Sequence, residues 1–230
     1  MQNNKNVTMS TEEFEREFDI LYNNIMSNAA PSIDAYEKSV FLTKAQEEIV
    51  TAIYDGSFEH TEKLTESIDV LVTQMTYDSF FDAEPVPEWK KISPDSRMFK
   101  LSPPAMFITY EELTSHEKDK CGNETKVLVK PVKHDEYYRI IRNPFRRPRK
   151  REALRLNTED MVEIVSTYQN YTYKVRYLRR PQPIILYDKQ PGLTIEGRDS
   201  RTECELPPMV HRLILDRAVQ LAAAVYKQPS

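Results

Sequence analysis

Glycine is scarce in this sequence: 4 of 230 residues, where a soluble protein has about 7 per cent. Loops that cradle phosphates need closely spaced glycines, because only a backbone without Cβ atoms can approach the ligand closely. The four glycines are scattered along the chain, at Gly56, Gly122, Gly192 and Gly197. They form neither G-x-G-x-x-G nor G-x-x-x-x-G-K, so nucleotide binding by those two motifs is excluded.

Cysteine and long apolar runs are also lacking. Cys121 and Cys204 are too few for a disulfide framework, which fits a reducing cytosol. No apolar run approaches the roughly 18 residues that a bilayer span requires. The first residues, MQNNKNVTMSTEEF, are polar and then acidic, unlike the apolar region of a signal peptide. The sequence therefore predicts a soluble protein with no membrane partner, made in the cytoplasm and not exported by the usual route.

Motifs that carry chemistry are missing as well. The four histidines are isolated from one another, and no H-E-x-x-H, C-x-x-C or G-x-S-x-G is present. The acidic pairs, such as Glu12-Glu13, are adjacent, so in a helix their carboxylates diverge instead of converging on one site. We therefore predict no catalytic, cofactor or metal site and no bound cofactor. An enzyme with a site assembled from residues distant in sequence remains an alternative.

Cys204 and His211 lie seven residues apart across a Pro-Pro pair. Two interpretations are open: half of a metal site, or a buried thiol beside a helix-terminal histidine. The second is favoured, because neither residue belongs to a Cys/His cluster with zinc spacing.

Charge is unevenly distributed along the chain. Residues 1–138 contain 14 Lys/Arg and 26 Asp/Glu, a net charge of −12, and residues 139–230 contain 18 and 10, a net charge of +8. An acidic half and a basic half suit head-to-tail association of identical copies. The alternative is that each half only solvates its own surface.

The first eighty residues show helical periodicity. Residues 1–9 are Asn-rich and predicted to be a disordered tail, and residues 10–80 to be a helical region. Ser10 and Glu13 have the spacing of a capping box, and Gly56 stands where a helix C-cap uses glycine. Apolar residues at helical spacing predict three helices, over residues 10–28, 33–54 and 61–77. Their apolar faces are assigned to core packing, with a partly intermolecular role as the alternative.

Residues 81–205 are predicted to be β-rich, since five prolines between residues 81 and 104 exclude a long helix. Short β-like runs occur at 98–101, 105–110, 127–132, 161–167, 172–178 and 184–187. The segment MVEIVSTYQNYTYKVRYLRR is typical of a hairpin turning at Gln169-Asn170. Residues 206–230 predict a C-terminal helix and tail, with the helix packed on the body. The fold class is therefore α+β: a helical N-terminal region, an antiparallel β-rich middle and a packed C-terminal helix.

One feature is concentrated: residues 139–155, which we call the basic segment. It holds eight basic residues, interleaved with the aromatic side chains of Tyr137, Tyr138 and Phe145 and stiffened by Pro144 and Pro148. We predict that its central part is an extended protein-interface arm. The predicted contact residues are Arg142, Phe145, Arg146, Arg147, Arg149, Lys150 and Arg151.

Three interpretations of the basic segment compete. As an interface arm, it pairs its guanidinium groups with acidic surface on a neighbour. As a nucleic-acid contact, it neutralises phosphates while the aromatics stack on bases. As a plain solvated loop, it has no partner. The prolines argue against a helix entering a DNA groove, and no helix-turn-helix, zinc or RNP signature is present, so the interface is favoured and nucleic-acid binding is the main alternative.

Three blocks of the sequence resemble a known family. The N-terminal block FEREFDILYNNIMSNAAPSIDAYEKSVFLTKAQEEIVTAIYDG is similar to the opening of neck-ring, or head–tail connector, proteins of crAss-like bacteriophages. The block DEYYRIIRNPFRRPRKREALRL is similar to a second part of those proteins. The third is YKVRYLRRPQPIILYD, followed by ECELPPMVHRLILDRAVQLAAAVY. Together the blocks cover well over half the chain in the same order.

The resemblance implies a virion structural protein located in the connector between head and tail and synthesised in the host bacterial cytoplasm. It implies a ring of identical subunits, twelvefold in that family, docked beneath the portal. The partners implied are other copies, the portal protein and adjacent neck or tail ring proteins, with genomic DNA passing through the lumen and touching it non-specifically. No cofactor and no catalytic residue are implied.

Overall fold

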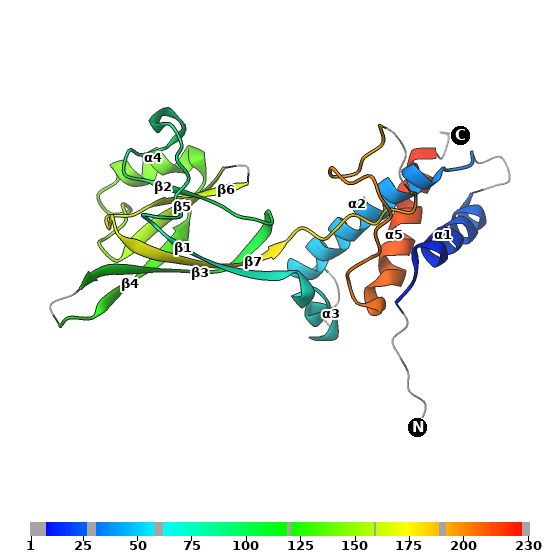
Figure 1. Ribbon diagram of the computed structural model, residues 1–230, viewed down its shortest axis with the longest axis horizontal. Coiled ribbons are helices and arrows are strands. Elements are labelled where there is room, and N and C mark those ends of the chain that lie inside the picture. The colour runs from blue at the N-terminus through cyan, green and yellow to red at the C-terminus, as the bar shows by residue number, and fades with distance from the viewer. Residues whose placement is uncertain are drawn as a thin grey trace, which may run out of the picture. The chain divides into compact units, whose positions relative to one another are not determined.

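The computed structural model describes residues 8–26, 31–57, 62–118, 121–158, 160–188 and 192–226. The chain divides into two compact units (Figure 1): unit 1 comprises residues 1–71 and 181–230, and unit 2 comprises residues 72–180. Unit 2 is thus inserted into unit 1 in the sequence. The predicted α+β class is confirmed, with helices near both ends of the chain and a mixed sheet in the middle. The disordered tail predicted for residues 1–9 falls almost entirely outside the described residues.

Unit 1 contains the helices α1 (Thr11–Ile25), α2 (Ala35–Tyr54), α3 (Glu62–Ser67) and α5 (Pro208–Tyr226). The predicted first two helices are confirmed, and each begins with a capping box. At α1 the Glu13 amide donates to Ser10 Oγ (3.3 Å) and the Ser10 amide donates to Glu13 Oε2 (2.9 Å). Asp34 and Glu37 exchange the same pair of bonds at α2. These side chains satisfy amides that have no partner inside the helix.

The C-terminal helix α5 packs against α1 and α2, as predicted. The alanines Ala218, Ala222 and Ala223 are buried along it, which allows close approach of its neighbours. Arg217 Nε donates to Glu48 Oε2 at 2.6 Å, which ties α5 to α2. None of the helices in the described part of the chain is long and apolar enough to cross a membrane.

Unit 2 is built on one seven-stranded sheet in the order β1-β7-β3-β4-β5-β6-β2. Its strands are β1 (Val72–Asp78), β2 (Arg97–Lys100), β3 (Ala105–Lys118), β4 (Glu124–Pro131), β5 (Glu152–Thr158), β6 (Met161–Val165) and β7 (Tyr171–Arg179). All neighbouring pairs are antiparallel except β4–β5, which is parallel and connected through helix α4 (His134–Arg142). The middle of the chain is therefore a mixed sheet, where the sequence predicted an antiparallel one.

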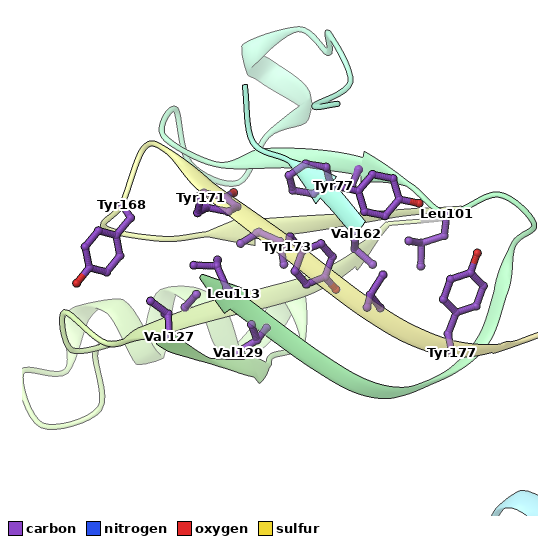
Figure 2. Packing of buried hydrophobic residues seen from close by; sticks show 14 residues of the cluster. Tyr77, Leu101, Leu113, Val127, Val129, Val162, Tyr168, Tyr171, Tyr173 and Tyr177 are labelled. Atoms are coloured by element: carbon purple, nitrogen blue, oxygen red, sulfur yellow. The ribbon is translucent and has the colours of Figure 1, made fainter. Parts of the chain in front are cut away.

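The core of unit 2 is rich in tyrosine (Figure 2). Tyr171, Tyr173 and Tyr177 alternate along β7, all pointing to the buried side, as the predicted strand with one polar face requires. Edge strands β1 and β2 approach each other across this core: Tyr77 Oη donates to the Lys100 carbonyl (2.8 Å), and its ring lies 5.4 Å from that of Phe99. The sheet therefore curls around a single aromatic cluster.

A buried ion pair links strands that are not neighbours in the sheet. Arg155 Nε of β5 donates to Glu111 Oε2 of β3 at 3.1 Å, and both side chains are about nine-tenths buried. Tyr173 Oη of β7 donates to the other carboxylate oxygen, Glu111 Oε1, at 2.6 Å. Burial, together with the negative charge of Glu111, raises the pKa of Tyr173 far above its ordinary value.

The predicted third helix is wrong in its second half. Helix α3 ends at Ser67, a short 3₁₀ turn covers Asp69–Leu71, and β1 occupies Val72–Asp78. The β1 sequence VTQMTYD is rich in β-branched residues, and β1 pairs with β7 along its full length. The backbone hydrogen bonds to β7 therefore stabilise a strand here, although the apolar residues of the segment have helical spacing.

The predicted hairpin is also wrong. The chain does turn between β6 and β7, but β6 pairs with β5 and β2, whereas β7 pairs with β1 and β3. The run at 184–187 is not a strand: Ile185 forms only an isolated bridge to Thr202. Its side chains are buried in unit 1, so their apolar character reflects packing and not sheet pairing.

Candidate assembly surface

The basic segment does not form one extended arm. Arg139 and Arg142 lie in the last turn of α4, Arg155 lies in β5, and residues 143–151, which we call the basic loop, connect the two. Pro144 ends the helix, because proline disfavours helical geometry in the residue before it. Acidic residues in the first turn of α4 and basic residues in the last turn both complement the helix dipole.

Helix α4 carries two adjacent tyrosines, one buried and one exposed. Tyr137 packs with Leu154 and Leu156 of β5. Its neighbour Tyr138 is exposed, as is Phe145, of which 94% is accessible. The three interleaved aromatics thus separate into one core residue and two surface residues.

The basic loop is held in a defined shape by hydrogen bonds from its backbone amides to side-chain and backbone acceptors. Asn143 Oδ1 accepts from the Phe145 amide (2.9 Å), and the Asn143 carbonyl accepts from the amides of Arg146 and Arg147. The Arg149 amide donates to Glu152 Oε2 at 3.1 Å, and the Glu152 amide donates back to the Arg149 carbonyl. A surface that is already ordered loses less conformational entropy on binding.

The far end of the basic loop is attached to the sheet. The Arg151 carbonyl accepts from the Leu128 amide of β4, and the Lys150 carbonyl accepts from Thr167 Oγ1. The hydrogen bond from Lys130 is the main factor that lowers the pKa of the Glu152 carboxyl, with a further contribution from the Arg149 amide. This carboxylate therefore stays ionised and fixes the loop where it enters β5.

The basic side chains fall into two groups. Arg139 and Arg155 are used inside the chain, by Glu136 (2.7 Å) and Glu111. Lys150 Nζ lies 5.7 Å from the centre of the Tyr168 ring. In the part of the chain that the structure describes, no carboxylate lies within ion-pair distance of the remaining members, Arg142, Arg146, Arg147, Arg149 and Arg151. Five guanidinium groups are therefore available to an external partner.

Phe145 stands between three open hollows of the surface. The first, about 730 Å³, is lined by Tyr138, Arg139, Arg142, Asn143, Pro144 and Phe145. The second and third, about 590 and 580 Å³, bring in Arg146, Arg147, Arg149 and Lys150. All predicted contact residues except Arg151 therefore line one continuous surface. Tyr138 and Pro144 belong to it too, although neither is among the contacts predicted from the sequence; the signal is their position, four residues before Arg142 and two before Arg146.

The candidate metal half-site is not supported. Cys204 is buried and its Sγ donates to Gln46 Oε1 (3.7 Å), and burial raises its pKa to about 12. His211 is buried at the start of α5: Nδ1 accepts from the Met9 amide, so Nε2 carries the proton and donates to the Leu206 carbonyl (2.8 Å). Among the described residues, no three His, Cys, Asp or Glu side chains come together as a metal would require.

Comparison with known proteins identifies the family of the chain. The family model described as phage tail ring protein 3/4 matches residues 9–230. The chain is 40% identical over 225 residues to "Ring protein 3" of Bacteroides phage crAss001, covering 93% of this chain and 95% of that protein. It is 38% identical over 230 residues to "Ring protein 4/5" of the same phage, covering 95% and 94%. The resemblance found in the three sequence blocks is thereby confirmed, and the chain belongs to the phage tail ring protein 3/4 family.

Proposed function

We propose that this chain is a virion structural subunit that closes into a ring in the connector between portal and tail, with DNA passing through the lumen. The observation that carries the proposal is the match to ring proteins over nearly the whole chain. The chain acts by binding, not by catalysis. The ring's partners are further copies, adjacent neck or tail rings and the portal protein, in the twelvefold arrangement that the family resemblance implies.

Charge supports this proposal. A ring closes through head-to-tail contacts, so each subunit needs two different complementary faces. Unit 1 contains 11 Lys/Arg and 20 Asp/Glu, a net charge of −9, and unit 2 contains 21 and 16, a net charge of +5. Opposite charges on two structural units favour association between copies and disfavour wrong pairings. In this proposal the basic loop and the adjoining surface of α4 form a protein contact, because Tyr138, Ile141 and Phe145 add exposed apolar surface that phosphates do not require.

The test is native mass spectrometry and particle imaging of the full-length protein, alone and mixed with portal and neighbouring ring proteins. A closed ring with a fixed number of 27.0 kDa subunits is the expected result. A chain that stays monomeric in every mixture would overturn the proposal.

The second candidate is a nucleic-acid-binding protein, favoured by the five arginines without an internal ion pair. Such a protein binds duplex DNA as a monomer, with an affinity that falls steeply as salt rises. Binding titrations at several salt concentrations decide between the two: tight, salt-dependent binding by the monomer favours this candidate, and its absence at low salt removes it.

A further inference from the structure

A second exposed aromatic feature lies elsewhere in unit 2, at the turn that follows β1. We call residues 78–82 the Phe80–Phe81 turn. Phe80 and Phe81 are 78% and 82% exposed, and their rings meet edge to face at 5.2 Å. The two adjacent rings form a contiguous exposed apolar surface, a feature of interaction sites in soluble proteins.

This turn is held rigidly. Asp78 Oδ1 accepts from the amides of Phe80 (2.8 Å) and Phe81 (3.2 Å), and the Asp78 amide donates to Asp82 Oδ2 (2.7 Å). Ser79 anchors the turn to the start of β7: its amide donates to the Tyr171 carbonyl, and its Oγ accepts from the Tyr171 amide. The two rings are therefore presented by a fixed backbone and not by a loose loop.

The stretch of sequence that contains the turn is acidic. No Lys or Arg occurs between residues 64 and 89, while six acidic residues do: Glu66, Asp69, Asp78, Asp82, Glu84 and Glu88. Glu84 and Glu88 lie two and six residues after the turn, and neither side chain lies within ion-pair distance of a described cation. The turn is thus an apolar tip followed by free negative charge.

These properties are complementary to those of the basic loop and the end of α4, where Tyr138, Pro144 and Phe145 lie beside arginines that have no internal ion pair. Both features belong to unit 2, yet Phe80, Phe81 and Phe145 remain almost fully exposed, so neither feature covers the other within one chain. We propose that the Phe80–Phe81 turn of one copy docks on the basic loop of a second copy. This inference rests on the proposed function and specifies which two surfaces join neighbouring subunits.

In this contact the two phenylalanine rings fill the hollow beside Tyr138, Pro144 and Phe145, and Glu84 and Glu88 pair with Arg146 and Arg147. An apolar aromatic centre with charged pairs at the rim is the usual anatomy of a specific interface. The contact joins two different surfaces, so it is heterologous, as a ring requires.

A charge-swap experiment tests the contact in the full-length protein. The turn variant carries Glu84→Lys and Glu88→Lys, the loop variant carries Arg146→Glu and Arg147→Glu, and a third variant carries all four changes. Each of the first two opposes like charges, so the fraction of chains in rings should fall by about tenfold or more. The four-change variant restores opposite charges and keeps the net charge of −4, so its ring fraction should return to the wild-type level. A 1:1 mixture of the turn and loop variants should also form rings.

A matched control is Lys44→Glu with Lys63→Glu, two exposed residues of α2 and α3. It changes the net charge as the loop variant does and should leave ring formation unchanged. Phe80→Ser with Phe81→Ser should abolish rings and leave the far-ultraviolet circular dichroism spectrum unchanged, because the two rings are exposed.

The outcomes separate this inference from the proposed function. Suppose that the wild-type chain forms rings. Normal assembly of the turn and loop variants, or a four-change variant that does not restore rings, would then overturn the inference but not the proposed ring. A wild-type chain that forms no ring in any mixture overturns both.

Discussion

The buried ion pair of unit 2 provides a quantitative test of what holds the curled sheet together. Arg155 and Glu111 connect β5 and β3, which form no backbone ladder with each other. Replacing Arg155 with Met keeps much of the side-chain volume and removes the charge. Glu111 then stays buried with one hydrogen bond, from Tyr173.

Two energies set the expected loss in the free energy of unfolding: the cost of an unpaired buried charge and the cost of protonating the carboxylate. Removing one partner of a buried ion pair costs about 3–5 kcal/mol. A carboxyl group can escape this penalty by taking up a proton, which at pH 7 costs about 3.7 kcal/mol for an ordinary glutamate. We therefore expect Arg155→Met to lower the free energy of unfolding by about 3–4 kcal/mol at pH 7. At pH 5 the protonation cost falls to about 1 kcal/mol, and the loss should fall with it.

The assay is urea unfolding followed by tyrosine circular dichroism in the near ultraviolet, with hydrogen exchange of β3, β5 and β7 peptides to assign the transition to unit 2. Adding Glu111→Gln to Arg155→Met removes the buried charge but keeps an acceptor for Tyr173, so the double variant should be more stable at pH 7 than the single one. A loss below about 1 kcal/mol at pH 7, or an equal loss at pH 5 and pH 7, would refute the reasoning.

Four further predictions concern a buried histidine, a buried tyrosine, the cap of α2 and the basic loop. Burial lowers the pKa of His211, so the unfolded chain binds more protons and the free energy of unfolding should fall as pH drops below about 6.5; His211→Gln should flatten this dependence in thermal melts. Burial raises the pKa of Tyr77 to about 12, so stability should fall as pH rises from about 10 to 12; Tyr77→Phe should reduce the slope, with phenolate absorbance as the readout. Asp34→Ala removes the cap of α2 and should cost about 1 kcal/mol in urea unfolding, while Asp34→Asn costs less. The triple variant Arg146→Glu, Arg147→Glu and Arg149→Glu should block ring or portal assembly and leave the monomer folded; normal assembly in native mass spectrometry would contradict an interface role for the basic loop.

Local chemistry explains what could be predicted from the sequence. The caps of α1 and α2 involve residues three apart, so Ser10 with Glu13 identifies a helix start without reference to the rest of the chain. The alternation along β7 is likewise local, and the absence of glycine motifs depends on composition alone.

What could not be predicted depends on partners distant in sequence. The apolar residues of β1 have helical spacing. The segment forms a strand because β7, about a hundred residues later in the sequence, supplies its backbone partners. Strand β5 is not among the β-like runs found in the sequence, because its first four residues belong to the basic segment, and only the contact with Glu111 explains how Arg155 is buried. The exposure of Phe80 and Phe81 could not be predicted either, since two phenylalanines in a row ordinarily indicate a core.

The insertion of unit 2 within unit 1 has a consequence for synthesis on the ribosome. Helices α1 and α2 emerge first, but their principal packing partner, α5, is translated last. Unit 2 can fold as soon as β7 has emerged, whereas unit 1 must keep its apolar helix faces unpaired until the chain is almost finished. The ends of unit 2 leave from paired positions on adjacent strands, since Val72 lies opposite Leu178. Completion of unit 1, the more acidic of the two units, is therefore the final step of folding, and it follows the folding of the inserted unit 2.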